Sequence, residues 1–332
     1  MRRGPAALLV ALALGVLASV AAALPTRDGD PYEGPIAVQS QPVPMDPRDP
    51  GHTAIGAFTY AGGVVLTSTQ TEFLHGISDL KVWPDGRLLA QSDVGYMFEG
   101  HVLLDAKGWL TGVTLNRILP MLDYKGRRLF PQSQMEYDSE GVAELPNGDR
   151  LSSFEHNHRV LLYPKDGGLP RPAPFPAGAY EFNGSFEAIA ADPAVGPDAY
   201  RLGLEPTGQT WLCRVSAGCE TARSLDLEGL ELSGFEMVPD GGMAYLLRSY
   251  VAGRGNVVRL VLIDRDGRRI DRMEIAPPLT IDNFEGIGVV PGPGGRLRIY
   301  LVSDDNFGIF QGKPTDQRTL LLAFDWTPPK GH

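Results

Sequence analysis

From Ile55 onward, short runs of apolar and β-branched residues alternate with tight-turn signals along the chain. Pro-Asp-Gly stands at 84–86 and at 239–241, and Pro-Asn-Gly stands at 146–148, each between two such runs. These tripeptides are typical of turns that join antiparallel strands, and no long window keeps the 3.6-residue apolar period of an amphipathic helix. The pattern therefore predicts a chain that is nearly all β.

A repeated unit organises these strands. It consists of an acidic residue beside small or apolar ones, a short strand, a glycine turn, a second strand and a polar tip. From the second copy on, the acidic residues follow one another at intervals of 47, 49 and 49 residues, whereas the first interval of 61 requires an insertion within 119–137. The leading acidic residues of the five copies are Asp79, Glu140, Glu187, Glu236 and Glu285.

Second hairpins lie between these units, so each period holds four strands, which is the size of one propeller blade. We therefore expect an all-β fold, a β-propeller of four-stranded blades. Six periods fit the length of the mature chain, so six blades are favoured and five are the alternative. The N-terminal strands at 57–67 and the C-terminal strand at 319–325 are expected to pair and close the ring, because a closed ring hides its sheet edges.

The N-terminus has the three parts of a secretory signal. Two arginines precede an apolar run at 6–20, and three alanines at 21–23 form a small-residue cleavage site. We expect a signal peptide at 1–23, a poorly ordered leader rich in Pro, Asp and Gln at 24–54, and a single propeller domain at 55–328. The mature protein is then exported to the periplasm or beyond, with no membrane attachment after cleavage.

Composition and net charge limit the classes of partner that the protein could bind. The 332 residues carry a formal charge of −10 at pH 7, which disfavours nucleic acid and anionic membranes as partners. With 43% hydrophobic residues the chain can fill a large core, and a monomer is compatible with it. Its two cysteines, Cys213 and Cys219, are six residues apart, a spacing that predicts a disulfide across a hairpin in an oxidising compartment.

In a propeller the innermost strand of every blade starts near the central axis. The five leading carboxylates, Asp79, Glu140, Glu187, Glu236 and Glu285, are therefore expected around one channel mouth. Clustered carboxylates repel one another unless a cation or an arginine lies among them, and oxygen ligands favour Ca²⁺ or Mg²⁺ over zinc. We expect these residues to bind Ca²⁺. The alternative is that each hydrogen-bonds backbone amides of a neighbouring blade.

The polar tips after the second strands contain candidate catalytic residues. Glu155 and His156 could supply general acid and base catalysis, and Asp304 and Asp305 could act with them or add metal ligands. The alternative is a solvated or structural role for all four. Four arginines that could meet a phosphate are Arg87, Arg117, Arg248 and Arg254.

Several motifs resemble those of a bacterial secreted phytase-like family, described as esterase-like activity of phytase. They lie at 73–80, 91–93 and 139–142, and most specifically at 282–287, 303–307 and 317–324. The resemblance covers about 57–325 and implies a β-propeller, export and hydrolysis of phosphate or other esters. Two departures concern the rim: Val94 stands where members often carry arginine, and the copy near Glu205 lacks the serine tip.

The expected function is metal-assisted hydrolysis of a small-molecule ester or phosphoester at the axial face. A non-catalytic propeller that binds a ligand or protein, with purely structural carboxylates, is the rival interpretation. A lactonase-like propeller acting on cyclic esters is a third. The sequence contains no Gly-x-Ser-x-Gly elbow, Walker loop or His-Glu-x-x-His, which lowers the serine-hydrolase, nucleotide and zinc-protease alternatives.

Overall fold

A computed structural model describes residues 32–328 except 185, 252, 254 and 311. The expected signal peptide at 1–23 lies outside the described residues. Antiparallel pairing of the described strands forms five large sheets, one for each blade, and a separate two-stranded ribbon, in agreement with the all-β prediction. Among the described residues, no helix is both long and apolar enough to cross a membrane.

Each sheet contains a four-stranded blade. From the inner strand outward, blade 1 consists of β5 (Ile77–Val82), β6 (Arg87–Ser92), β7 (Tyr96–Leu104) and β8 (Leu110–Pro120), and blade 2 of β9 (Ser139–Glu144), β10 (Arg150–Phe154), β11 (Arg159–Tyr163) and β12 (Arg171–Pro172). Blade 3 consists of β13 (Ala188–Ala191), β14 (Ala199–Gly203), β15 (Gln209–Arg214) and β16 (Gly218–Ser224), and blade 4 of β17 (Glu231–Met237), β18 (Met243–Val251), β19 (Gly255–Ile263) and β20 (Arg269–Ile275). Blade 5 consists of β21 (Asn283–Pro291), β22 (Leu297–Asp304), β25 (Leu320–Trp326) and β4 (Phe58–Ser68).

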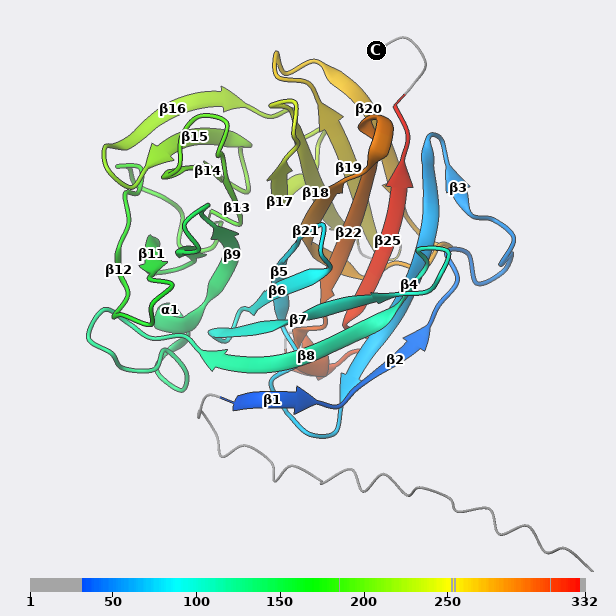
Figure 1. The fold of residues 1–332 in the computed structure, drawn as a ribbon, viewed down its shortest axis with the longest axis horizontal. Helices are drawn as coiled ribbons and strands as arrows, with labels where there is room; N and C mark the ends of the chain where they lie inside the picture. The colour runs from blue at the N-terminus through cyan, green and yellow to red at the C-terminus, as the bar shows by residue number, and fades with distance from the viewer. Residues whose placement is uncertain (1–31, 185, 252, 254, 311, 329–332) are drawn as a thin grey trace, which may run out of the picture.

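The described residues form a ring of five blades, so the preference for six was wrong. Each inner strand packs against the next, and β21 packs against β5 to complete the circle. The reason for the miscount lies in the closure: the N-terminal β4 pairs with the C-terminal β25, with Val64 opposite Leu321, and so completes blade 5 instead of building another. Figure 1 shows these two strands side by side, in blue and red. The predicted pairing of the chain ends is confirmed.

The segment expected to be a loose leader is structured from Tyr32 on. Strand β1 (Tyr32–Ile36) adds to the outer edge of blade 1, and β2 (Val38–Pro42) adds to β4 at the edge of blade 5. A short β3 (Ala54–Ile55) also pairs with β4. The connection between β8 and β9 holds the predicted insertion and contains the one-turn α1 (Gln134–Tyr137).

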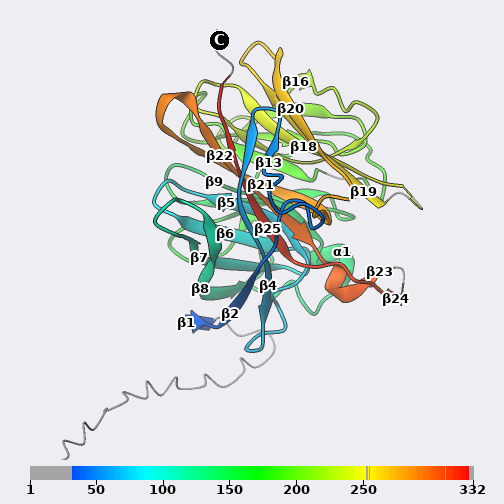
Figure 2. The same cartoon turned by 90° about the vertical axis from the view of Figure 1, so that its right-hand side faces the viewer.

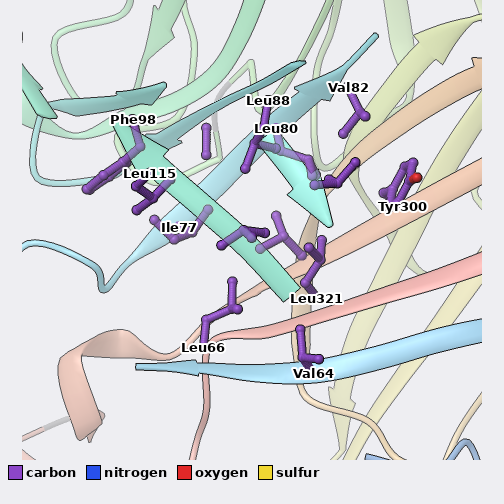
Figure 3. Packing of buried hydrophobic residues seen from close by; sticks show 14 of the residues in the cluster. Val64, Leu66, Ile77, Leu80, Val82, Leu88, Phe98, Leu115, Tyr300 and Leu321 are labelled. Atoms are coloured by element: carbon purple, nitrogen blue, oxygen red, sulfur yellow. The ribbon is translucent and has the colours of Figure 1, made fainter. Parts of the chain in front are cut away.

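Apolar side chains fill the gaps between neighbouring blades. The described residues form five buried apolar clusters, one in each gap. Figure 3 shows the cluster between blades 1 and 5, where Leu80 and Phe98 of one blade meet Val64 and Leu321 of the other. Both faces of each sheet are therefore buried. This explains why the strands are continuous runs of apolar residues and do not alternate between apolar and polar positions.

Glycines allow the inner strands to approach one another. A Cβ on Gly286 would lie 2.7 Å from the Cα of Asp79 in the next blade, and a Cβ on Gly141 would lie 2.6 Å from the carbonyl oxygen of Glu187. Likewise, a Cβ on Gly234 would lie 2.7 Å from the carbonyl oxygen of Glu285. The glycine near the start of each of these three inner strands is therefore required by packing at the axis.

The connections gather on one side of the ring. In Figure 2, α1, the adjoining ends of β18 and β19, and the strands β23 (Ile309–Phe310) and β24 (Lys313–Pro314) lie on the same side. Far from the axis, at the outer edge of blade 3, the predicted disulfide between Cys213 and Cys219 joins β15 and β16.

Candidate functional site

One face of the ring carries most of the candidate residues. In each blade the start of the inner strand lies beside the end of the second strand, as in the pairs Ile77–Ser92, Ser139–Phe154 and Asn283–Asp304. The polar tips therefore meet the leading acidic residues at one end of the channel. We call the resulting group the acidic face; it consists of Asp93, Asp138, Glu140, Glu155, Glu187, Glu205, Glu285 and Asp304.

Three of the five predicted metal ligands occupy one equivalent position. Glu140 and Glu285 are the extra residues of a β-bulge at the start of β9 and β21, and Glu187 immediately precedes β13. The same register places Ser78 in the bulge of blade 1 and Ser233 in that of blade 4. The two remaining candidates, Asp79 and Glu236, thus lie one and three residues further along their strands.

Asp79 and Glu236 share a lysine instead of joining the acidic face. The Nζ atom of Lys81 lies 3.2 Å from Asp79 Oδ2 and 3.2 Å from Glu236 Oε2, and all three side chains are buried or largely buried. The expectation that all five carboxylates converge on one site is therefore corrected to three. The cause is that the bulge position is a serine in blades 1 and 4, Ser78 and Ser233, so the acidic residue of each lies deeper along the strand.

Asp79 fits the structural alternative. Its carboxylate accepts hydrogen bonds from the backbone amides of Leu80 at 2.8 Å and of Val142, in the neighbouring blade, at 3.0 Å. The amide of Ile287, on the other side, lies 3.4 Å away. Burial raises the pKa of Asp79 to about 6, although Lys81 opposes this shift. Asp79 therefore links three blades at the axis.

Arg248 supplies positive charge to one part of the acidic face. Its Nη2 atom lies 3.3 Å from Glu187, 3.5 Å from Glu205 and 3.4 Å from Glu285, and its Nη1 donates to Asn283 at 3.2 Å. It extends from β18 toward the start of the neighbouring inner strands. Of the arginines that the sequence offered, Arg248 reaches the carboxylates of the acidic face, whereas Arg254 lies outside the described residues.

The remaining carboxylates are crowded and buried. Burial, together with repulsion from Asp138 and Glu187, raises the pKa of Glu140 well above its ordinary value. Burial also raises the pKa of Glu187, and Arg248 only partly offsets the effect. Glu187 and Glu205 lie within hydrogen-bonding reach of each other, so this pair can share a proton.

Asp93 and Asp304 form a second crowded pair. Burial and mutual repulsion with neighbouring carboxylates raise the pKa of both well above the ordinary value for aspartate. Asp304 accepts a hydrogen bond from the amide of Asn306 at 2.7 Å. The Oδ1 atom of Asp93 is buried and has no hydrogen-bond partner among the described residues. Sequence analysis noted Asp93 as a tip residue but did not select it.

Asp305 does not belong to the acidic face, because its carboxylate is engaged by other residues. It accepts hydrogen bonds from the Gly76 amide at 3.0 Å and from Thr319 at 2.9 Å, and it pairs with the imidazole of His75. Burial alone would raise the pKa of Asp305, but the hydrogen bonds from His75 and Gly76 lower it below the ordinary value. We therefore assign Asp305 to holding the loop before β5.

Glu155 and His156 meet a residue that the sequence did not single out. His156 Nε2 lies 2.8 Å from Asp138 Oδ2, while Glu155 Oε1 accepts a hydrogen bond at 2.8 Å from the amide of Gly184. Asp138 precedes β9 and lies outside the repeated motif, so no pattern marks it. Burial raises its pKa to about 6, although His156 opposes the shift.

A cavity of about 1130 Å³ opens beside Arg248 and Glu285. Its other walls come from the tip of the β18–β19 hairpin, from α1 and from the loop before β25, which contributes Gln317 and Arg318. These are the connections that project together in Figure 2. A small molecule in this cavity would contact the edge of the acidic face.

Comparison with known proteins gives one family match. The family model of phytase-like proteins, described as "Esterase-like activity of phytase", matches residues 72–307. A search of curated proteins finds no match. The matched stretch runs from the loop before β5 to the end of β22, and so includes every residue of the acidic face.

Solved structures of similar fold are distant. A putative gluconolactonase has 13% identity, with 92% of this chain and 96% of that chain covered and a TM-score of 0.43. Regucalcin from Agrobacterium tumefaciens has 12% identity, with 90% and 94% covered and a TM-score of 0.43. Virginiamycin B lyase from Staphylococcus aureus has 12% identity, with 88% and 100% covered and a TM-score of 0.41.

Proposed function

Because this chain belongs to the phytase-like family described as "Esterase-like activity of phytase", we propose that it is an exported, cation-assisted hydrolase of an ester or phosphoester. The observation that carries the proposal is the acidic face itself. Eight carboxylates are gathered at the mouth of the ring, and the guanidinium of Arg248 reaches three of them. Buried carboxylates in such numbers cost stability unless a cation compensates them.

The chemistry of the carboxylates that do not pair with Arg248 suits a hard cation. Glu140, Asp93 and Asp304 offer only oxygen ligands, which suit Ca²⁺ better than a soft metal. The buried Oδ1 of Asp93, which has no hydrogen-bond partner among the described residues, is an acceptor that such an ion would satisfy. When bound, the ion would polarise the ester or phosphoryl oxygen and lower the pKa of a water molecule.

Arg248 and the cavity would position the substrate. Arg248 lines the cavity, and its charge favours a substrate oxygen that gains negative charge during hydrolysis. The neighbouring pair of Glu187 and Glu205 would hold one proton and pass it to the leaving group. The raised pKa of both carboxyl groups supports this role, since a general acid must be protonated near neutral pH.

Export remains part of the proposal. The signal peptide and its cleavage after 23 would deliver the mature chain to an oxidising compartment, and the Cys213–Cys219 disulfide fits that address. Amino-terminal sequencing of the protein recovered outside the cytoplasm tests this directly. A mature terminus near Leu24 is expected, and recovery of the intact terminus from the cytoplasm would contradict it.

Hydrolysis is tested with three substrates. The mature protein, stripped with a chelator, is assayed with phytate, an activated carboxylic ester and a lactone, each with and without Ca²⁺. Turnover of at least one substrate that returns with Ca²⁺ is expected, and the preferred substrate separates phosphatase, esterase and lactonase chemistry. Absence of turnover with all three, in the presence of Ca²⁺, would favour the rival interpretation of a ligand-binding propeller.

A further inference from the structure

Three side chains at the edge of the acidic face form a nitrogen-containing cluster. Asp138 comes from the segment between α1 and β9, whereas Glu155 and His156 directly follow β10. One donor atom from each lies within 4.8 Å of the others. All three side chains are nearly buried, with 9%, 10% and 7% of their surface exposed. Oxygen and nitrogen donors are thus collected from two separate segments.

The hydrogen bonds of His156 define its tautomer. Its Nδ1 atom lies 3.0 Å from the carbonyl oxygen of Phe182, which can only accept, so Nδ1 carries the hydrogen. The opposite atom, Nε2, faces Asp138 Oδ2 at 2.8 Å. In a neutral imidazole this Nε2 presents a lone pair, and the carboxylate oxygen presents another. Two lone pairs at this distance require a positive centre between them, either a proton or a metal ion.

The surroundings favour a metal ion. A histidine that binds a metal commonly donates its other ring N–H to a backbone carbonyl, as His156 does to Phe182. The imidazole is also fixed by stacking on the Phe182 ring at 4.4 Å, and by a backbone φ of 55° that non-glycine residues rarely adopt. Neighbouring ligands of an octahedral metal ion with bonds of about 2.1 Å lie roughly 3 Å apart, and the Nε2–Oδ2 separation of 2.8 Å is close to this value.

The negative charges around the cluster also favour a bound cation. Glu155 and Glu285 repel the Asp138 carboxylate, and Asp138 and Glu155 both repel Glu140. Arg248, the guanidinium of the acidic face, is engaged with Glu187, Glu205 and Glu285 instead. Asp93, whose buried Oδ1 has no partner among the described residues, adds a further negative charge beside Asp138.

We propose that Asp138, Glu155 and His156 form a second cation site, specific for a divalent transition-metal ion such as Mn²⁺ or Zn²⁺. The imidazole nitrogen distinguishes it from the all-oxygen part of the acidic face, because Ca²⁺ takes oxygen ligands whereas Mn²⁺ and Zn²⁺ accept imidazole. Glu155 contributes through Oε2, since the amide of Gly184 occupies Oε1. The site does not depend on which reaction the protein catalyses.

The test measures binding and not turnover. The chelator-treated mature protein, in buffer that contains excess Ca²⁺, is titrated with Mn²⁺ and followed by electron paramagnetic resonance of the free ion. We expect one Mn²⁺ to bind despite the Ca²⁺, and His156→Ala to weaken it at least tenfold. His158→Ala is the matched control: it removes the same side chain two positions away, where Nε2 contacts the carbonyl of Glu181, and it should bind Mn²⁺ like the wild type.

Two outcomes would overturn the site. The first is no Mn²⁺ binding in the presence of Ca²⁺, which would mean that a proton joins His156 to Asp138. The second is binding that His156→Ala leaves unchanged. If that variant does not fold, as judged by circular dichroism, Asp138→Asn replaces it with the same expectation. Substitution by Co²⁺ adds a spectroscopic criterion, because its visible absorption band should change in Asp138→Asn and stay the same in His158→Ala.

Discussion

Asp79 in blade 1 accepts a hydrogen bond of 3.0 Å from the backbone amide of Val142 in blade 2. The same carboxylate lies 3.2 Å from Lys81, whose Nζ is equally close to Glu236 of blade 4. A charged group at the axis therefore joins blades that are not neighbours in sequence. This arrangement separates the stabilising carboxylates of the channel from those of the acidic face.

Loss of the Asp79 charge should lower stability but not cation binding. Asp79→Asn leaves Lys81 with one carboxylate and replaces one of the two oxygens that accept from backbone amides with an NH₂ donor, so we expect a loss of about 3 kcal/mol in the free energy of unfolding. Urea denaturation measures it, and Glu220→Gln at an exposed position of β16 is the control. A loss below about 1 kcal/mol, or a changed Ca²⁺ affinity, would argue against a purely structural role.

Stability of the cation-free protein should fall as the pH rises. Burial raises the pKa of Asp138 from its ordinary 3.8 to about 6, so the folded protein binds this proton more tightly than the unfolded chain does. Its contribution is complete below about pH 4 and is lost as the pH passes through 6; Asp93, Glu140, Glu187 and Asp304 extend the loss upward.

Added Ca²⁺ should reverse this trend, because it stabilises the ionised carboxylates. Thermal unfolding in chelator and in Ca²⁺ at about pH 5 and pH 8 measures the effect, and the shift in Tm on adding Ca²⁺ should be larger at pH 8. An equal shift at both values would mean that the acidic face does not bind the ion.

Arg248→Met should have opposite effects on catalysis and on cation binding. It removes the positive charge from three carboxylates, so turnover should fall about a hundredfold. The stabilisation by Ca²⁺ should increase, because the freed carboxylates need another cation. Arg87→Met, which removes a half-exposed arginine from the start of β6, is the control. An Arg248→Met enzyme with unchanged turnover would exclude this residue from the reaction.

The disulfide should stabilise the fold without affecting the site. Cys213 and Cys219 close a short loop at the outer edge of blade 3, which predicts about 2 kcal/mol from the loss of chain entropy in the unfolded state. Replacement of both cysteines by serine should lower the free energy of unfolding by that amount and leave turnover unchanged. Changed kinetic constants in this variant would show that blade 3 transmits strain to the acidic face.

The repeat in the sequence predicted the propeller and its closure because each blade must repeat the same turns and core positions. The number of blades depends on where the two ends of the chain pair. In the sequence, the strands at these ends have the pattern expected for one more blade. Only the pairing of β4 with β25 shows that they complete blade 5.

The sequence predicted only part of the site, because it does not show the register of the strands. Glu140, Glu187 and Glu285 lie at equivalent positions, but Asp79 lies one residue and Glu236 three residues beyond the bulge position, which is a serine in blades 1 and 4. The repeat aligned the acidic residues with one another, and only the strand pairing shows which of them stand at the bulge. Asp138 and Glu205 lie in connections outside the repeated motif, and Arg248 reaches across a blade boundary that the sequence does not define.

The most direct test of the account is the Ca²⁺ dependence of kcat/KM for the substrate that the wild type hydrolyses best. The measurement compares the wild type with Glu140→Gln at the acidic face and Glu236→Gln in the channel. We predict that Glu140→Gln needs at least tenfold more Ca²⁺ for half-maximal activity, and that Glu236→Gln needs the same amount as the wild type. Equal Ca²⁺ requirements in all three proteins would contradict the assignment of the acidic face as the site of cation-assisted hydrolysis.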